Sequence, residues 1–282
     1  MNEKPRKVDI VVISDVHLGT YGCHAKELLQ YLKSIKPKTI ILNGDFVDIW
    51  QFSKRYWPKS HMKVVKQLMK MLGKGVKMYY VTGNHDELLR KFEGLKLGSF
   101  EIVNKLLLDI NGEKAWIFHG DVFDLTMRHS KWLAKLGAIG YNTLILLNRS
   151  VNYISEKVFK KGKISLSKKI KNSVKKAVSY INDFETTAAE IGIYNEYAYV
   201  ICGHIHHPQI KTIETSKGRI TYLNSGDWIE NLTALEYSKG AWNIYQHKAE
   251  DFNDAVTQEE EEMDTSQLFQ NMVKEFDQMK AV

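Results

Sequence analysis

The chain has 282 residues, 44% of them hydrophobic, and a formal charge of +7. This size and composition can bury one large core, which excludes a mainly disordered protein and a small disulfide-stapled domain. Two cysteines, no apolar signal core at the N-terminus and no apolar run near the roughly 20 residues of a membrane span predict a cytoplasmic protein.

The charge is unevenly distributed along the chain. Residues 250–282 hold ten acidic residues and two lysines, a net charge of −8, so the first 249 residues carry +15. We expect 250–282 to be an acidic tail outside the folded core. The basic body favours an anionic partner: a phosphate ligand, an acidic lipid surface or nucleic acid. A peripheral contact with a membrane surface is compatible with this charge.

The first third of the chain alternates between strands and helices. Runs rich in β-branched residues predict strands at 8–14, 39–45 and 76–86, and helical spacing of leucine, valine and methionine predicts helices at 25–36 and 63–75. A strand–helix–strand order predicts a parallel sheet with right-handed crossovers.

The later part of the chain has a different pattern. Asn-Gly and Lys-Gly turns predict hairpins over 102–121, 210–227 and 232–247, with a further strand over 196–204, so we expect an antiparallel second half. Two helical stretches rich in leucine and lysine interrupt it. The predicted domains are a discontinuous core, 1–124 with 196–249, and a helical insertion over 125–195.

Polar clusters follow five of the predicted strands. They read SDVHLG, NGDFVDIW, GNHDE, HGD and GHIHH, and they contain Asp15, His17, Asp45, Asp48, Asn84, His85, His119, Asp121, His204 and His206. Ligands bind at the carboxyl ends of strands in α/β sheets. The two side chains of Asp15-x-His17, and those of His204-x-His206, would leave an extended chain on one face.

Each cluster alone has an ordinary explanation, such as a turn, a cap or a polar loop. Together they supply carboxylate, imidazole and amide groups, a mixed set that suits Mn²⁺, Zn²⁺ or Fe²⁺ rather than calcium. The ligands are too many for one ion, and two ions about 3.5–4 Å apart would use them all.

The ordered set DxH, GD, GNHD, HGD and GHxH over residues 8–237 resembles the calcineurin-like metallophosphoesterase superfamily. The resemblance implies an α/β fold, a two-sheet β-sandwich flanked by helices, with two divalent ions, most simply Mn²⁺. It implies that Asp15, His17 and His206 hold one ion, that Asn84, His119 and His204 hold the other, and that Asp45 bridges them.

The resemblance also implies roles for three residues around the ligands. His85 corresponds to the imidazole that assists the leaving oxygen, so it is the predicted catalytic residue. Asp48 and Asp121 are expected to orient ligands. A plain surface loop is an equal alternative for Asp48.

Within the superfamily, GDFVDIW and the lysine-rich insertion after HGD resemble the UDP-2,3-diacylglucosamine diphosphatases of lipid A synthesis. Those enzymes form UMP and a lipid phosphate, and their insertion is a lid. The resemblance makes Arg128, Arg149, Lys169, Lys171 and Lys175 candidate substrate contacts, with a solvated helix face as the alternative. The best-known members read GNRD where this chain reads GNHD, which leaves open a sister branch with a related substrate.

Three other functions are compatible with parts of the sequence. They are a phosphatase or phosphodiesterase for soluble nucleotides, phosphoesters or another lipid, a non-catalytic scaffold, and a nuclease. The complete ligand set argues against a scaffold. No nucleic acid is expected, because the basic residues of the insertion lack interleaved aromatic residues.

Overall fold

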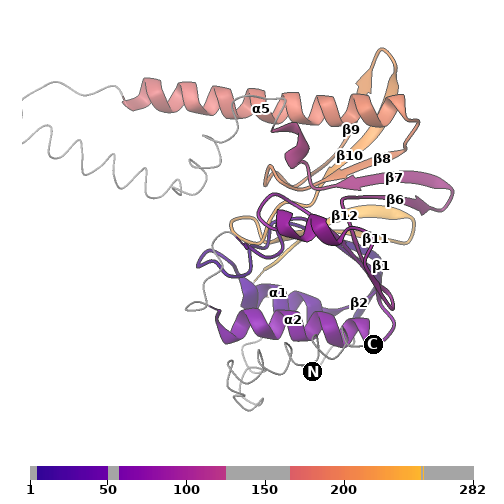
Figure 1. The fold of residues 1–282 in the computed structure, drawn as a ribbon. Helices are drawn as coiled ribbons and strands as arrows, with labels where there is room; N and C mark the ends of the chain where they lie inside the picture. The colour runs from indigo at the N-terminus through magenta and orange to yellow at the C-terminus, as the bar shows by residue number, and fades with distance from the viewer. Residues whose placement is uncertain (1–4, 50–56, 125–165, 249, 251–282) are drawn as a thin grey trace, which may run out of the picture.

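The computed structural model describes residues 5–49, 57–124, 166–248 and 250, with the backbone alone for 166–176. It has four layers: a pair of helices, a seven-stranded sheet, a five-stranded sheet and one long helix (Figure 1). The predicted α/β fold, a two-sheet sandwich flanked by helices, is confirmed. One hydrophobic core lies between the sheets, and one lies under each helical layer.

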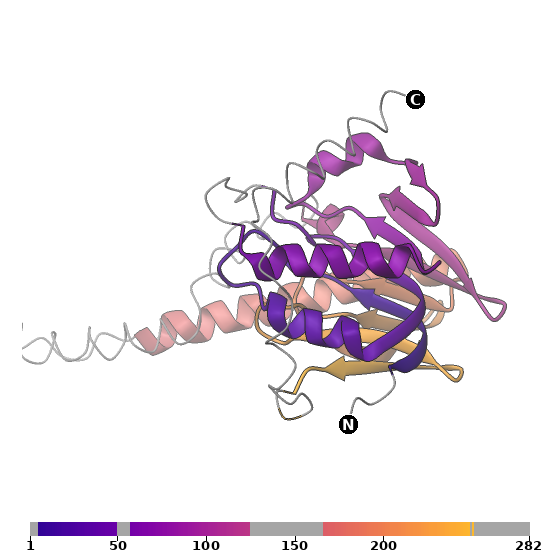
Figure 2. The ribbon, with the colours of Figure 1, turned by 90° about the horizontal axis from the view of Figure 1, so that it is seen from below.

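The seven-stranded sheet carries the predicted parallel strands at its centre. Its strand order is β12-β11-β1-β2-β3-β5-β4, and β1, β2, β3 and β5 pair in parallel. The strands are β1 (Arg6–Ile13), β2 (Ile35–Asn43), β3 (Lys77–Val81), β4 (Lys96–Leu97), β5 (Phe100–Val103), β11 (Thr233–Ser238) and β12 (Ala241–Gln246). Helices α1 (Ala25–Ser34) and α2 (Lys59–Leu72) lie side by side across its outer face (Figure 2).

Side chains of the central strands alternate between two cores. Val11 and Ile13 of β1 pack under α1 and α2, whereas Val12 between them packs against the second sheet. This is the two-residue period of a strand that is buried on both faces. It explains why these strands read as unbroken apolar runs in the sequence.

The five-stranded sheet has the order β6-β7-β8-β10-β9. Its strands are β6 (Lys105–Ile110), β7 (Glu113–Phe118), β8 (Tyr199–Cys202), β9 (Gln209–Thr215) and β10 (Gly218–Asn224). Helix α5 (Leu166–Tyr194) covers its outer face, and the N-terminal part of α5 extends past the edge of the sheet (Figures 1 and 2). Of the helices in the described part of the chain, none is long and apolar enough to cross a bilayer.

The expectation of an antiparallel second half is wrong for β8, while the predicted hairpins are antiparallel. Strand β8 pairs in parallel with both β7 and β10. The crossover that a parallel β7–β8 pair requires contains α5, and β9 lies between β8 and β10 in the chain. The hairpin of β11 and β12 joins the first sheet, where β11 pairs with β1. Local turn signals found the hairpins but could not assign them to a sheet.

Several predicted boundaries also differ from the structure. The segment predicted as one strand from residue 102 is split at Asn104: β5 ends in the first sheet and β6 begins in the second. The helix predicted over 25–36 ends at Ser34, and β2 starts at once. Short 3₁₀ helices follow two of the motifs, η1 (Glu87–Phe92) after GNHD and η2 (Asp121–Phe123) after HGD.

The C-terminal half of α5 belongs to the core of the second sheet. Phe184, Ala188 and Ala189 are buried there together with β7, β8 and β10 side chains. These residues fall within 125–195, the range that the sequence assigns to an insertion. Since 125–165 lies outside the described residues, the insertion and the acidic tail remain predictions.

Candidate metal centre

The five motifs converge at one end of the sandwich. The loops after β1, β2 and β3 come from the first sheet, and those after β7 and β8 come from the second. Their imidazole and carboxylate groups form clusters in which all ligand atoms lie within 4.8 Å of one another. The tertiary fold therefore brings together residues up to 191 positions apart, from Asp15 to His206.

The backbone at these loops is strained. Five candidate ligands have left-handed φ angles, with values of 52° for Asp15, His17 and Asp45, 67° for His204 and 50° for His206. Such conformations cost about 1–3 kcal/mol per non-glycine residue and persist at functional sites where the surroundings enforce them. The expected extended chain at Asp15-x-His17 and at His204-x-His206 is therefore wrong. Asp15 and His17 still join the same cluster, whereas His204 and His206 join different ones.

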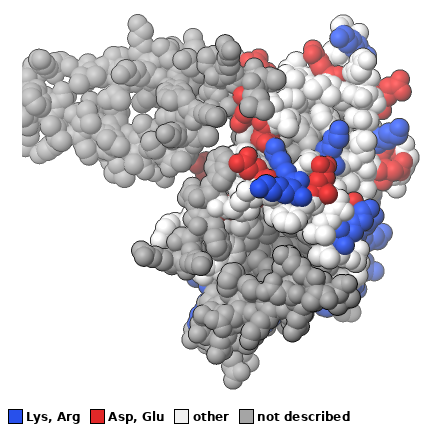
Figure 3. Space-filling model, viewed as in Figure 1, with Lys and Arg blue, Asp and Glu red and all other residues white. Residues whose placement is uncertain are grey.

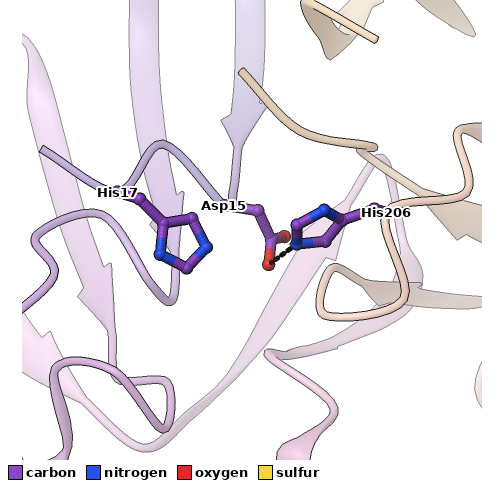
Figure 4. Close-up of side chains that lie close together, drawn as sticks. All are labelled: Asp15, His17 and His206. Carbon is purple, nitrogen blue, oxygen red and sulfur yellow. Dashed lines mark ion pairs between the residues drawn. The ribbon is translucent and has the colours of Figure 1, made fainter. Parts of the chain in front are cut away.

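The first cluster contains Asp15, His17 and His206 (Figure 4). Asp15 is fully buried, and its Oδ1 lies 3.2 Å from Nε2 of His206. Its Oδ2 accepts a hydrogen bond from the backbone N–H of His204 at 3.0 Å, so one carboxylate contacts both His204 and His206 of the GHIHH loop. These are the three residues that the sequence assigns to one ion.

The second cluster contains Asp45, His119 and His204. Nε2 of His119 lies 3.2 Å from Oδ2 of Asp45, and its Nδ1 donates to the carbonyl of Asn43 at 2.9 Å. That carbonyl fixes the tautomer that leaves Nε2 as a ligand. Oδ1 of Asp45 accepts the backbone N–H of His85 at 2.8 Å, which joins the GD and GNHD loops.

Several buried ligand atoms of the site make no hydrogen bond, as expected of atoms that would bind divalent cations. In the described part of the chain, four candidate ligands each have a buried polar atom with no hydrogen bond: Asp15 Oδ1, His17 Nε2, Asn84 Oδ1 and His119 Nε2. Buried polar atoms are nearly always satisfied, so four such atoms in one site are compatible with ion ligands. Their oxygen and nitrogen chemistry matches Mn²⁺, Zn²⁺ or Fe²⁺.

Opposite charges compensate one another in the cluster. Burial raises the pKa of Asp15, but the imidazoles of His206 and His119 outweigh it and hold this pKa at about 2. Burial lowers the pKa of His206, yet Asp15 raises it to about 9. The carboxylates are therefore ionised and ready to bind cations at neutral pH, and ion binding would displace protons from the imidazoles.

His85 and Asp48 form a pair beside the first cluster. Nδ1 of His85 lies 2.9 Å from Oδ2 of Asp48, which is buried and lies 3.4 Å from Nδ1 of His17. The ring of His85 packs edge-on against that of His17, with 4.6 Å between centroids. The structure places Asp48 where it can orient both imidazoles, rather than on a plain surface loop.

Asp121 has a different neighbour from the one expected. Its Oδ2 lies 2.5 Å from the guanidinium of Arg90, so it links η2 to η1. The acid of this loop that reaches a candidate ligand is Asp124, whose Oδ1 lies 3.1 Å from Nε2 of His204. Sequence reasoning missed Asp124 because HGD marks only the first acid of HGDVFD.

A further motif that sequence reasoning missed is NSGD at 224–227. Asn224 donates to the carbonyl of Gly203, and the hydroxyls of Ser225 and Ser14 share a 2.7 Å hydrogen bond. Asp227 accepts backbone N–H groups of the turn that follows and lies 4.0 Å from Nδ1 of His206. NSGD thus holds the DxH and GHIHH loops together. Like the five predicted motifs it follows a strand-like run, and this feature of the sequence could have identified it.

The predicted substrate contacts are not tested by the structure. Arg128 and Arg149 lie outside the described residues, and no side chain is described for Lys169, Lys171 or Lys175 on α5.

Residues 8–208 match the family model of the calcineurin-like phosphoesterases. The chain belongs to this family. The protein is therefore an enzyme, a phosphoesterase or pyrophosphatase. Members of the family use divalent metal ions, and the His/Asp clusters described above are the candidate sites for them.

Two bacterial relatives named UDP-2,3-diacylglucosamine hydrolase are similar to this phosphoesterase. The one from Aliivibrio fischeri is 25% identical over 242 residues, covering 84% of this chain and 98% of its own. The one from Vibrio cholerae is 26% identical over 243 residues, covering 80% and 93%. A solved structure of an archaeal phosphodiesterase aligns with 84% of this chain and 98% of its own at 14% identity, with a TM-score of 0.41.

Proposed function

We propose that the enzyme hydrolyses the phosphoanhydride of UDP-2,3-diacylglucosamine to UMP and 2,3-diacylglucosamine 1-phosphate, a step of the lipid A pathway. One observation carries this choice. Both bacterial relatives are named for this hydrolysis, and their alignments cover 93–98% of their own length.

Each motif has a role in this reaction. Asp15, His17 and His206 would hold one divalent ion, and three further residues would hold the second. Those three residues are Asn84, His119 and His204, and Asp45 would lie between the two ions. Bound there, the ions, most simply Mn²⁺, would polarise the phosphoryl oxygens and acidify an attacking water molecule.

His85 would donate a proton to the oxygen that leaves phosphorus. Its ring is about a quarter exposed, at 24%, while Asp48 at 2.9 Å is almost fully buried. The carboxylate would stabilise the protonated imidazole and keep its ring aimed at the site. This pairing lets a histidine act as the acid at near-neutral pH.

A second candidate is hydrolysis of another phosphoester or phosphoanhydride by the same centre. His85 favours it, because the best-known enzymes of the lipid A group have arginine at this position. An imidazole offers a proton where a guanidinium offers only a fixed charge. A soluble nucleotide or another phospholipid would be the substrate in that case.

The proposed location of the enzyme is the cytoplasm, with peripheral binding to the inner membrane, where a diacylated substrate resides. On the face in Figure 3, the described Lys and Arg side chains are interspersed with Asp and Glu. That face offers no single basic patch. Membrane attraction would therefore have to come from another face or from residues 125–165.

The test is product release in the presence of Mn²⁺. Purified enzyme is incubated with UDP-2,3-diacylglucosamine, with UDP-glucose, and with a dinucleotide, and UMP is measured by chromatography. UMP from the diacylated substrate alone supports the proposal. Equal turnover of the soluble compounds would instead support the second candidate.

A further inference from the structure

One carboxylate oxygen joins the candidate metal centre to helix α5. Oδ1 of Asp124 accepts a hydrogen bond from the hydroxyl of Tyr180 at 2.7 Å, and it lies 3.1 Å from Nε2 of His204. Asp124 directly follows η2 in the loop after β7, whereas Tyr180 projects from the middle of α5. Three separate segments thus meet at a single atom.

The neighbouring turn of α5 is packed on the same two loops. Phe184 is fully buried, with its ring centroid 5.3 Å from that of Phe123 and 6.4 Å from that of His204. A side chain at Gly120 would collide with the Phe184 ring, so the HGD loop approaches the helix as closely as glycine allows. Helix α5 therefore has a fixed position against both loops.

We propose that Asp124 and Tyr180 are positioning residues for His204, and that they couple helix α5 to the second cluster of metal ligands. The inference rests on the metal centre proposed above, but not on the identity of the substrate. Asp124 restrains the His204 imidazole, and the Tyr180 hydroxyl in turn restrains Asp124. Such outer partners of a ligating histidine fix its orientation and raise its affinity for the ion.

The coupling has a consequence for the helix. If the position of α5 favours ion binding at His204, then ion binding must favour that position of α5 by the same free energy. Helix α5 is the C-terminal part of the range predicted as a lid, 125–195. A substrate that binds to another part of this helix would therefore change the ion affinity of the metal centre through Tyr180.

The test is a calorimetric Mn²⁺ titration of the metal-free full-length protein. The variants are Asp124→Asn and Tyr180→Phe. Matched controls on the same helix are Asp183→Asn and Tyr194→Phe, because Asp183 is exposed and Tyr194 is 83% exposed. Circular dichroism and thermal melts of the metal-free proteins establish that every variant is folded.

We expect wild type and both controls to bind two ions. Asp124→Asn should weaken one of the two sites by about ten-fold or more, and Tyr180→Phe should weaken the same site by about two- to ten-fold, the effect of one hydrogen bond. The other site should keep its affinity. Unchanged affinities in two folded variants would overturn the proposal, whereas a wild type that binds no ion would overturn the metal centre itself.

Hydrogen exchange gives a second readout that a merely structural role would not change. Mn²⁺ should slow amide exchange in the part of α5 around Tyr180 in wild type and in Tyr194→Phe, and it should do so less in Tyr180→Phe. Ion-induced protection that is equal in all three proteins would show that the hydroxyl carries no coupling.

Discussion

His85 and Asp48 are joined through Nδ1 and Oδ2 at 2.9 Å, while the same oxygen lies 3.4 Å from Nδ1 of His17. One buried carboxylate therefore faces a candidate proton donor and a candidate metal ligand. His17, Asp48 and His85 also lie close enough to form a third group of possible metal ligands, but the sequence assigns His17 to an ion and His85 to proton donation. The two imidazoles should therefore respond differently to mutation.

Replacing His85 by alanine should lower turnover by about 10²–10⁴-fold, the usual contribution of a positioned acid. Both ions should still bind, because the predicted ligand set does not include this side chain. Turnover is measured with a chromogenic phosphodiester, and ion content is measured by atomic emission. His24→Ala, at a half-exposed histidine on the surface, is the control. Loss of one ion in the His85 variant would make this residue a ligand instead.

Replacing Asp45 by asparagine should abolish hydrolysis and weaken ion binding. Oδ1 and Oδ2 of Asp45 serve different loops, with Oδ2 facing His119 at 3.2 Å, and an amide supplies only one oxygen and no charge. Calorimetric Mn²⁺ titration and turnover are both informative. The control is Asp9→Asn, which alters a partly exposed carboxylate paired with Lys38. Full turnover in the Asp45 variant would contradict its place between the ions.

Replacing Gly83 by alanine should disrupt the centre by crowding alone. A Cβ at this position would overlap Oδ1 of Asp45 and come too close to the His119 ring. We expect a loss of stability of about 1–3 kcal/mol in urea unfolding and weaker Mn²⁺ binding. Gly73→Ala is the matched control, since its Cβ would make only an ordinary 3.5 Å contact. Equal behaviour of the two variants would show that the loops adapt freely.

Alkaline pH should unfold the protein through its buried tyrosines. Burial raises the pKa of Tyr31 and of Tyr222 well above 10, and for Tyr31 the carboxylate of Glu236 adds to this shift. Above pH 10 the unfolded chain loses these phenol protons and the folded chain keeps them, so stability is complete below pH 10 and falls as pH rises further.

Thermal melts between pH 8 and pH 11.5, followed together with phenolate absorbance at 295 nm, measure this effect. Tyr31 and Tyr222, which are fully buried, should ionise only when the protein unfolds. Tyr222→Phe should reduce the dependence of the melting temperature on pH above 10. A variant with the full wild-type dependence would rule out this residue as a source of it.

The sequence determined the features that are encoded locally. Buried apolar runs such as VDIVVIS defined β1, and amphipathic spacing defined α1 and α2, because short-range patterns record which faces are buried. The five polar motifs identified the chemistry in the same way. Each residue of the three described groups of possible metal ligands, including Asp15 and His206, belongs to a motif that can be read directly from the chain.

The tertiary structure decided what depends on distant neighbours. Only the fold placed β11 beside β1 rather than in the second sheet, and only the fold distinguished Asp124, near His204, from Asp121, which binds Arg90. The left-handed backbone at the candidate ligands belongs here too, because a conformation that is unfavourable by itself exists only where surrounding contacts enforce it.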